Sequence, residues 1–215
     1  MREKLVNAAD RMVAVIAARQ HGAISTAQLY AAGLTANGIA RRVAAGRLHR
    51  VHRGVYAVGH AGLSREGAWM AAVVACGEGA LLSHLSAAML WGMLKSRQAA
   101  VHVSVPTPGG RARRKALHVH RCATLSPSHA RLRSNIPVTS PARTLWDLRR
   151  VAPGDEFRRA LRQAEFLRLP IHELEADRTR SELERRFLAL CRRARLPAPE
   201  VNVRVGAFLV DLLWR

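Results

Sequence analysis

Aromatic residues are scarce in this chain of 215 residues, and cysteine is nearly absent. Aromatics make up 5% of the residues, so alanine, leucine and valine must form most of the core, which favours helices with some β-structure. The three cysteines, Cys76, Cys122 and Cys191, are odd in number and widely spaced. This spacing argues against a disulfide framework and against a zinc knuckle. We expect three small buried groups in a reducing cytoplasm.

Long uncharged apolar runs are also lacking. Residues 1–10 are charged and polar, unlike a signal peptide. The apolar runs at 68–76 and 79–94 are broken by glycine and polar residues, and neither reaches the roughly 18 residues that a membrane span needs. An apolar content of 49% is nevertheless typical of a folding chain. The sequence therefore predicts a cytoplasmic protein without a membrane partner.

Negative charge is the third deficit. Lysine and arginine total 35 against 15 acidic residues, a net charge of +20. Residues 1–60 hold 9 basic and 2 acidic residues, residues 61–135 hold 10 and 2, and residues 136–215 hold 16 and 11. Such a surface repels itself unless a polyanion compensates it, and nucleic acid is the usual polyanion. The alternative explanation of the positive charge is a GC-rich genome, which raises the arginine content without any binding partner.

Residues 1–60 show the pattern of a winged helix-turn-helix. Apolar residues recur at helical spacing over residues 8–20. Ser25 and Thr35 are placed to cap two further short helices, the second over residues 36–45. Residues 48–58 then alternate as a hairpin whose tip lies near Arg53 and Gly54. Two short helices followed by a basic hairpin predict a DNA-binding domain.

The exposed side chains of the third helix and the hairpin are the candidate DNA contacts. A recognition helix presents its N-terminal residues to base edges in the major groove, where asparagine pairs with adenine and arginine with guanine. The candidates on this helix are Thr35, Asn37, Arg41 and Arg42. The hairpin supplies cations for phosphates or the minor groove: Arg47, Arg50 and Arg53. A solvated basic helix that binds nothing specific is the alternative.

Residues 61–177 predict a mixed α/β middle domain. Ser64 starts a helix that Gly77 ends, a second helix is expected over residues 81–93, and strands are expected over 101–105 and 117–121. We expect these strands to form a hairpin around an exposed basic loop. Further elements are a strand at 136–138 and helices from Ser140 and over 157–167. The loop cations contact phosphates or an acidic partner, or form a solvated turn: Arg111, Arg113, Arg114 and Lys115.

Four histidines of the middle domain, His84, His102, His118 and His120, are candidates to gather in space. His118 and His120 alternate on one strand and so share a face. No carboxylate or cysteine accompanies them at metal-ligand spacing, so we interpret them as ordinary structural histidines.

Residues 178–215 predict a short α/β fragment with a helix over 182–193 and strands over 201–205 and 208–214. Glu182 and Glu184 fall on the helix and Asp211 on the last strand. Carboxylates so placed hold Mg²⁺ in phosphodiester cleavage. Surface glutamates and one strand aspartate are the alternative, which the residues alone favour.

Several of these stretches resemble AbiEi-family antitoxins of type IV toxin–antitoxin systems, which are common in actinobacteria. They are AARQHG at 17–22, GRLHRVHRGVYAVG at 46–59, SHLSAA at 83–88, WG at 91–92 and IPVTSPARTL at 136–145. The resemblance covers roughly residues 8–175. It implies a DNA-binding repressor of its own operon that counteracts a nucleotidyltransferase toxin.

The last part resembles the opening of a very-short-patch-repair-like nuclease domain of the PD-(D/E)XK superfamily. The matching residues are SELE at 181–184, LPAP at 196–199, Asn202 and VDLLW at 210–214. The resemblance makes Glu184 and Asp211 metal-site residues. Relatives continue into a strand with Glu-Val-Asp-Gly and then a histidine, which this sequence lacks, so we expect a truncated module.

Together these interpretations predict an α+β protein with three parts. They are a winged helix-turn-helix at 1–60, an AbiEi-like middle domain at 61–177 and an incomplete nuclease-like fragment at 178–215. The expected function is transcriptional regulation through double-stranded DNA, with a nucleotidyltransferase toxin as a further partner and no cofactor. The alternative is a Mg²⁺-dependent endonuclease, inactive here because its metal site is incomplete. A module that engages an acidic toxin through its basic middle domain is compatible with the first hypothesis.

Overall fold

The computed structural model describes residues 2–95, 100–106, 116–171, 187, 190–194, 196–197, 199–205 and 208–214. The chain divides into two compact units, Met1–Pro170 and Ile171–Arg215. The described residues form helices and three sheets, of three, five and two strands. The predicted mixed α+β class is thus confirmed.

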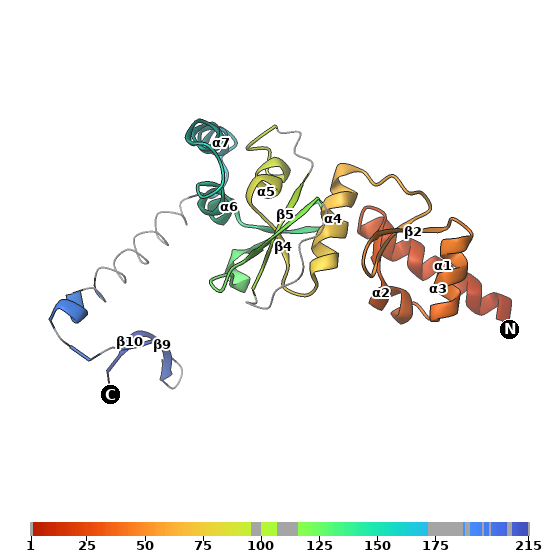
Figure 1. Cartoon of the computed structure of the whole chain (residues 1–215), viewed down its shortest axis with the longest axis horizontal. Coiled ribbons are helices and arrows are strands. Elements are labelled where there is room, and N and C mark those ends of the chain that lie inside the picture. Colours follow the sequence, from red (N-terminus) through yellow and green to blue (C-terminus); the bar gives the residue numbers. More distant parts are fainter. Residues whose placement is uncertain are drawn as a thin grey trace. The chain divides into compact units, whose positions relative to one another are not determined.

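The first unit begins with three helices and a small antiparallel sheet (Figure 1). In order, the elements are α1 (Arg2–Arg19), β1 (Ala23–Ser25), α2 (Thr26–Ala31), α3 (Ala36–Ala44), β2 (Leu48–His52) and β3 (Val55–Val58). The strand order is β1-β3-β2, with β3 antiparallel to both neighbours. This succession matches the helices and hairpin predicted from the sequence. Strand β1, only three residues long, was not predicted, because so short a segment carries no readable period.

Local capping defines α2 and α3, as the sequence predicts. The Ser25 hydroxyl accepts a hydrogen bond from the Gln28 amide at 3.1 Å, while the Gln28 side chain accepts one from the Ser25 amide at 2.9 Å. The Thr35 hydroxyl likewise accepts from the Gly38 amide at 3.1 Å. Each bond satisfies a donor that a helix start leaves free. The two helices therefore begin at fixed residues.

A single apolar cluster holds these elements together. Its members come from all three helices, all three strands and the turn between α2 and α3: Ala9, Val13, Ile24, Leu29, Leu34, Ile39, Leu48 and Tyr56. Ile24 and Leu29 are fully buried, and Ile39 is the α3 residue that enters the cluster. Because Ile39 faces inward, the opposite side of α3 faces solvent.

The rest of the first unit is a five-stranded mixed sheet with helices. Its elements are α4 (Arg65–Cys76), β4 (Leu81–Leu82), α5 (His84–Leu90), β5 (Val101–Val105), β6 (Leu117–Arg121), the 3₁₀ turn η1 (Pro127–His129), β7 (Ala130–Arg133), β8 (Ile136–Thr139), α6 (Pro141–Leu148) and α7 (Gly154–Phe166). The strand order is β6-β5-β4-β8-β7. In Figure 1, α4 lies on one side of this sheet and α5 and α6 lie on the other. The caps predicted at Ser64 and Ser140 are both present.

Two expectations for this region are wrong. Residues 81–82 form strand β4, which pairs with β5 and β8, and the helix starts only at His84. Tertiary pairing here overrides an apolar pattern that also fits a helix. The strands over 101–105 and 117–121 are not a hairpin either, because β5 and β6 pair in parallel. Parallel neighbours need a crossover rather than a tight turn.

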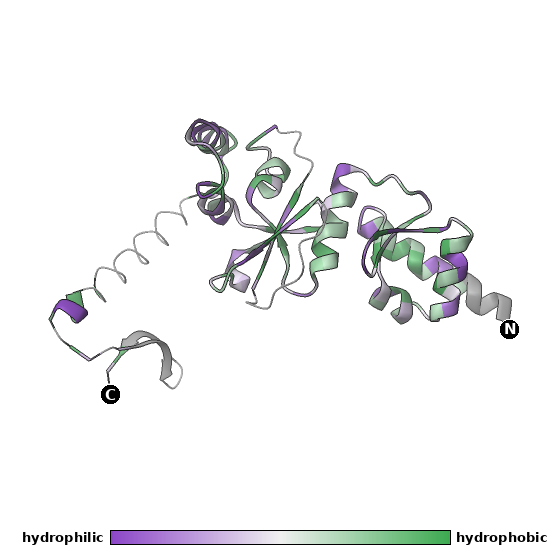
Figure 2. Cartoon of the chain, in the orientation of Figure 1, coloured by the Kyte–Doolittle hydropathy of each residue, from purple (hydrophilic) through white to green (hydrophobic). Residues whose placement is uncertain are grey.

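Helix α4 joins the small sheet to the large one. Eight of its residues are buried, and Figure 2 shows hydrophobic residues along most of its length. Gly67 lets α4 pack closely against the turn between α1 and β1, because a Cβ at this position would lie 2.6 Å from the His21 carbonyl oxygen. His21 also bonds through Nε2 to the Ser134 carbonyl at 2.6 Å. Among the described helices, none has the length and apolar character of a membrane span.

The second unit contains a two-stranded antiparallel sheet of β9 (Glu200–Val205) and β10 (Phe208–Leu213). This confirms the two strands predicted near the end of the sequence. The Trp214 indole donates to the Pro197 carbonyl at 2.8 Å and meets the Phe187 ring edge-on at 6.0 Å. Of the helix predicted over 182–193, residues 187 and 190–193 are helical, and residues 182–186 lie outside the described residues.

Candidate nucleic-acid interface

The solvent face of α3 carries two polar side chains, an asparagine and an arginine, among alanines. Asn37 and Arg41 lie one helical turn apart and both are exposed. Around them the exposed positions are small: Ala36, Ala40 and Ala44. Such a face lets a helix approach another surface closely, with one amide and one guanidinium projecting from it.

Thr35 stands at the N-terminus of α3 with its hydroxyl oxygen engaged in the cap. The residue is exposed, and its hydroxyl group still has a proton to donate. The first turn of a helix also presents free backbone amides and the positive end of the helix dipole. This end of α3 therefore suits an anion.

Arg42 is placed differently from the other predicted contacts. Its Nε and Nη2 donate to Asp10 Oδ1 of α1 at 2.9 and 2.7 Å, and its Nη1 donates to the Gly38 carbonyl at 3.1 Å. The Arg42 side chain is 12% exposed. All three donor groups thus point inward, and Arg42 fastens α3 to α1. The sequence held one hint of this, since Asp10 is the only acidic residue between positions 4 and 60.

The hairpin of β2 and β3 carries three exposed arginines beside α3. Arg50 lies on β2 with its guanidinium 5.7 Å from the centre of the Tyr56 ring, and Arg53 occupies the tip next to Gly54. Arg47 precedes β2, and its amide bonds to the Arg42 carbonyl at 2.8 Å. In the described part of the chain, no ion pair involves Arg47, Arg50, Arg53 or Arg41. Among the described side chains, no acidic group therefore neutralises these four charges.

The tip of this hairpin is tied to α2. The Gly54 carbonyl accepts two hydrogen bonds from Thr26, one from the amide at 2.8 Å and one from the hydroxyl at 3.2 Å. Gly54 has φ +74°, a conformation that glycine adopts without steric cost. The cationic hairpin and the helices are therefore parts of one packed domain.

Arg111, Arg113, Arg114, Lys115 and Glu184 lie outside the described residues. Asp211 lies on β10, and only its backbone is described.

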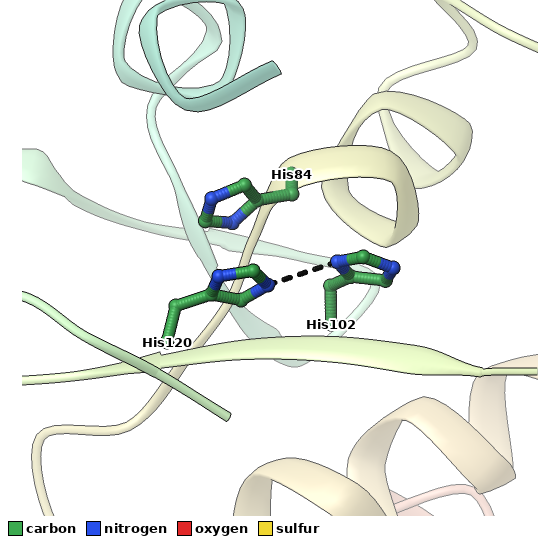
Figure 3. Close-up of side chains that lie close together, drawn as sticks. All are labelled: His84, His102 and His120. Carbon is green, nitrogen blue, oxygen red and sulfur yellow. Dashed lines mark hydrogen bonds between the residues drawn. The ribbon is translucent and has the colours of Figure 1, made fainter. Parts of the chain in front are cut away.

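The four histidines of the middle region do gather, as the sequence suggested. The His84 ring stacks on His120 with centroids 3.6 Å apart, and His102 stacks on His118 at 4.9 Å. Figure 3 shows His84 approaching from the start of α5 and His102 and His120 from the neighbouring strands β5 and β6. A nitrogen-to-nitrogen hydrogen bond of 2.9 Å joins His102 Nδ1 and His120 Nε2.

Burial keeps three of these rings, those of His84, His102 and His120, neutral at ordinary pH. Burial, followed by the charges of the neighbouring histidines, lowers the pKa of His84 from 6.5 to about 3 and that of His102 from 6.5 to about 4. The pKa of His120 is also lowered, by burial and then by His118. Neutral imidazoles are the form that binds metal ions.

A buried ion pair lies in the same region, and the only signal for it in the sequence is that Arg143 and Asp147 are four residues apart on the helix expected from Ser140. Arg143 Nε donates to Asp147 Oδ1 at 2.9 Å, and the two side chains are 7% and 5% exposed. Burial raises the pKa of Asp147 despite the attraction of Arg143. Arg143 Nη2 also donates to Cys122 Sγ at 2.8 Å. Burial raises the pKa of the Cys122 thiol, but its bonds with Thr124 and Arg143 outweigh burial and lower it overall.

Comparison with known proteins finds a family match in the N-terminal part. Residues 12–59 match the family described as transcriptional regulator, AbiEi antitoxin. This supports the AbiEi resemblance drawn from the sequence and a DNA-binding antitoxin regulator. Among solved structures, the RV2827C protein from Mycobacterium tuberculosis is similar with a TM-score of 0.41 and 16% identity, over 72% of this chain and 71% of that one. No curated protein matches.

Proposed function

We propose that residues 1–60 form a winged helix-turn-helix that binds operator DNA, and that the protein represses its own operon in the manner of an AbiEi antitoxin. The observation that carries this proposal is the exposed face of α3, with Asn37 and Arg41 beside the unpaired arginines of the β2–β3 hairpin. Such a regulator acts on its operator in the cytoplasm.

The dimensions and profile of α3 suit the major groove. An α-helix with its side chains is about 10–12 Å across, which fits the major groove, whose width is about 12 Å. The alanines on the exposed face allow a close approach to base edges. Asn37 then pairs with adenine and Arg41 with guanine, while the helix start and Thr35 face a phosphate.

The hairpin supplies the contacts that do not depend on sequence. Arg50 and Arg53 reach phosphates or the minor groove on one side of α3, and Arg47 reaches the backbone closer to the helix. The loop cations Arg111, Arg113, Arg114 and Lys115 keep their proposed role as further phosphate contacts. Arg42 is removed from the base-reading set, because Asp10 occupies its guanidinium.

Fluorescence anisotropy with two duplexes of equal length tests the proposal. One duplex carries the chain's own promoter, and the other has a shuffled sequence. We expect promoter binding that is at least about 10³-fold tighter, with an affinity that falls steeply with salt. Arg41→Ala should lower the preference for the promoter by about 10- to 100-fold, corresponding to one bidentate base contact.

Arg158→Ala is the matched control, because Arg158 is an exposed arginine of the same unit on α7. It should leave the preference unchanged. Equal affinity of the wild-type chain for promoter and shuffled DNA would remove the repressor function.

Neutralisation of a nucleotidyltransferase toxin is the second half of the proposal. It is supported by the antitoxin family matched at residues 12–59. Co-expression tests it: the chain should restore growth to cells that produce the neighbouring nucleotidyltransferase, and Arg41→Ala should restore it equally well. Rescue lost with this DNA-binding variant would mean repression rather than toxin neutralisation.

Endonuclease activity remains the sequence-based alternative. It depends on Glu184 and Asp211, and no described contact favours it. Incubating the chain and its Asp211→Ala variant with plasmid and Mg²⁺ tests it. We expect no difference between the two, and cleavage that the substitution abolishes would favour the nuclease.

A further inference from the structure

Three imidazoles from three separate elements meet inside the first unit. One nitrogen from each of His84, His102 and His120 lies within 4.8 Å of the others. His84 and His102 are buried and His120 is half-buried. In the described part of the chain, no carboxylate or thiol joins this group. Three neutral rings gathered without a counter-charge suggest a function other than ion pairing.

Local backbone geometry directs His84 into the group. His84 has φ +51°, in the left-handed region that a residue with a Cβ seldom adopts. Strain of this kind persists where the surrounding structure holds a side chain in a functional position. The Ser83 hydroxyl lies 2.9 Å from His84 Nδ1 and so orients the ring.

A buried hydroxyl beside the group has no partner. Ser104 lies two residues from His102 on β5, so both share a face, and its strand partner on β6 is His120. Ser104 is fully buried, and its oxygen has no hydrogen-bond partner among the described residues. Buried hydroxyls are normally satisfied. Its free oxygen points to a further ligand, such as metal-bound water, near the histidines.

We propose that His84, His102 and His120 form a binding site for one divalent transition-metal ion, with Zn²⁺ as the best fit. Imidazole nitrogen is a preferred ligand for this ion, and three protein ligands leave the fourth position open for water or an anion. The lowered pKa values of the three histidines support the site, because neutral rings offer their lone pairs without losing a proton first.

The spacing of the nitrogens is close to what the ion needs. Nitrogens bound tetrahedrally at 2.0–2.1 Å lie about 3.3 Å apart. His102 Nδ1 and His120 Nε2 are 2.9 Å apart because they share a hydrogen bond, which the ion replaces. The three nitrogens lie within 4.8 Å of one another, so the His84 ring has to move towards the other two to complete the set. The Ser83 hydroxyl supplies the outer contact that metal-bound histidines usually have.

Nearby positive charge decides the fourth ligand. Burial and the other two histidines lower the pKa of His84 most, and the positive charges of Arg143 and Arg150 add to this effect. The two arginines disfavour a bare dication. An anion in the open position, such as hydroxide or phosphate, compensates them. The site therefore differs from the proposed DNA surface, and each can fail without the other.

Zinc titration of the full chain after chelator treatment tests the site. We expect one Zn²⁺ per chain by calorimetry and elemental analysis, with a higher thermal midpoint. Bound Co²⁺ should give the intense visible absorption of a tetrahedral site. His102→Gln and His120→Gln should each weaken binding at least about 100-fold.

His118→Gln is the matched control. His118 is exposed and stacks on His102, but it is outside the group of three. It should bind Zn²⁺ within about threefold of the wild-type chain. If the two ligand variants fail to fold by circular dichroism, Ser83→Ala replaces them, with an expected loss of about tenfold.

A wild-type chain that binds no Zn²⁺, or binds it equally after His102→Gln and His120→Gln, overturns the proposal. So does an equal loss with His118→Gln. Promoter affinity measured on the same samples should stay unchanged in every variant, which separates this site from the DNA-binding function.

Discussion

The two parts of the first unit handle polar residues in opposite ways. Around α3 and the hairpin, arginines lie on the surface over an apolar cluster. In the mixed-sheet part, polar side chains are packed inside. Among the described residues, all buried polar and charged ones fall between Ser83 and Asp147. Surface cations are removed at little cost to folding, whereas buried polar groups are costly to unpair. Substitutions should therefore affect ligand binding in the first part and stability in the second.

The largest effect is expected from the buried ion pair. Asp147→Ala leaves the Arg143 guanidinium charged and unpaired in the interior, and we expect a loss of about 3–5 kcal/mol in the free energy of unfolding. Urea denaturation measures it. Asp155→Ala is the control, because the Asp155–Arg159 pair is about two-thirds exposed. It should change stability by less than about 1 kcal/mol. Similar losses in the free energy of unfolding for both variants would contradict the contrast between the buried and the exposed ion pair.

Acid should also act through the mixed-sheet part. The folded state lowers the pKa of His84 to about 3 and of His102 to about 4, so the unfolded chain takes up protons first as pH falls below about 6.5. The stability contribution is complete above that pH and is lost below it. Between pH 7.5 and 5, we expect the metal-free chain to lose about 2–4 kcal/mol.

Urea denaturation across this pH range, with chelator present, checks the acid effect. His102→Gln should make the dependence shallower, while His60→Gln, at an exposed position, should not. A stability that stays flat down to pH 5 would show that these histidines do not titrate as their burial requires.

A smaller effect on the free energy of unfolding is expected at Arg42, a cation of the first part whose guanidinium is paired. Arg42→Ala should cost about 1 kcal/mol or less, because Asp10 is more than a third exposed. Promoter preference should remain that of the wild-type chain, unlike in Arg41→Ala. A loss of preference equal to that of Arg41→Ala would place Arg42 among the base contacts after all.

The smallest effect is expected at the tip of the hairpin. Arg53→Ala should leave stability unchanged and weaken promoter and shuffled duplex alike. The slope of log affinity against log salt should fall by about 0.9, the share of one neutralised phosphate. An unchanged slope would show that Arg53 contacts no phosphate.

Local signals explain what the sequence predicted well. Ser25, Thr35, Ser64 and Ser140 begin helices by bonding amides three residues ahead, so neighbouring residues alone determine these starts. The hairpin tip at Gly54 is equally local. These signals suffice to outline α3 and its exposed face.

Long-range pairing explains the rest. Alternation over 101–105 and 117–121 looks the same in parallel and antiparallel strands, so the sequence could not exclude a hairpin. Likewise, a helical pattern shows that Arg42 is on α3 but not that Asp10, 32 positions away, lies beside it. His84 joins His102 and His120 only through packing of α5 on the sheet. The candidate sites were thus predicted as residue types, and their geometry came from the structure.

The two hydrogen bonds that Thr26 donates to the Gly54 carbonyl fix the hairpin tip before DNA binds. Because the hairpin is already ordered in the unbound protein, its backbone does not have to become ordered after α3 has bound. Less motion is then frozen at contact, so less of the interaction energy is spent on ordering the protein. The spacing between α3 and the hairpin is therefore fixed. DNA whose grooves do not match this spacing has to bend in order to contact both.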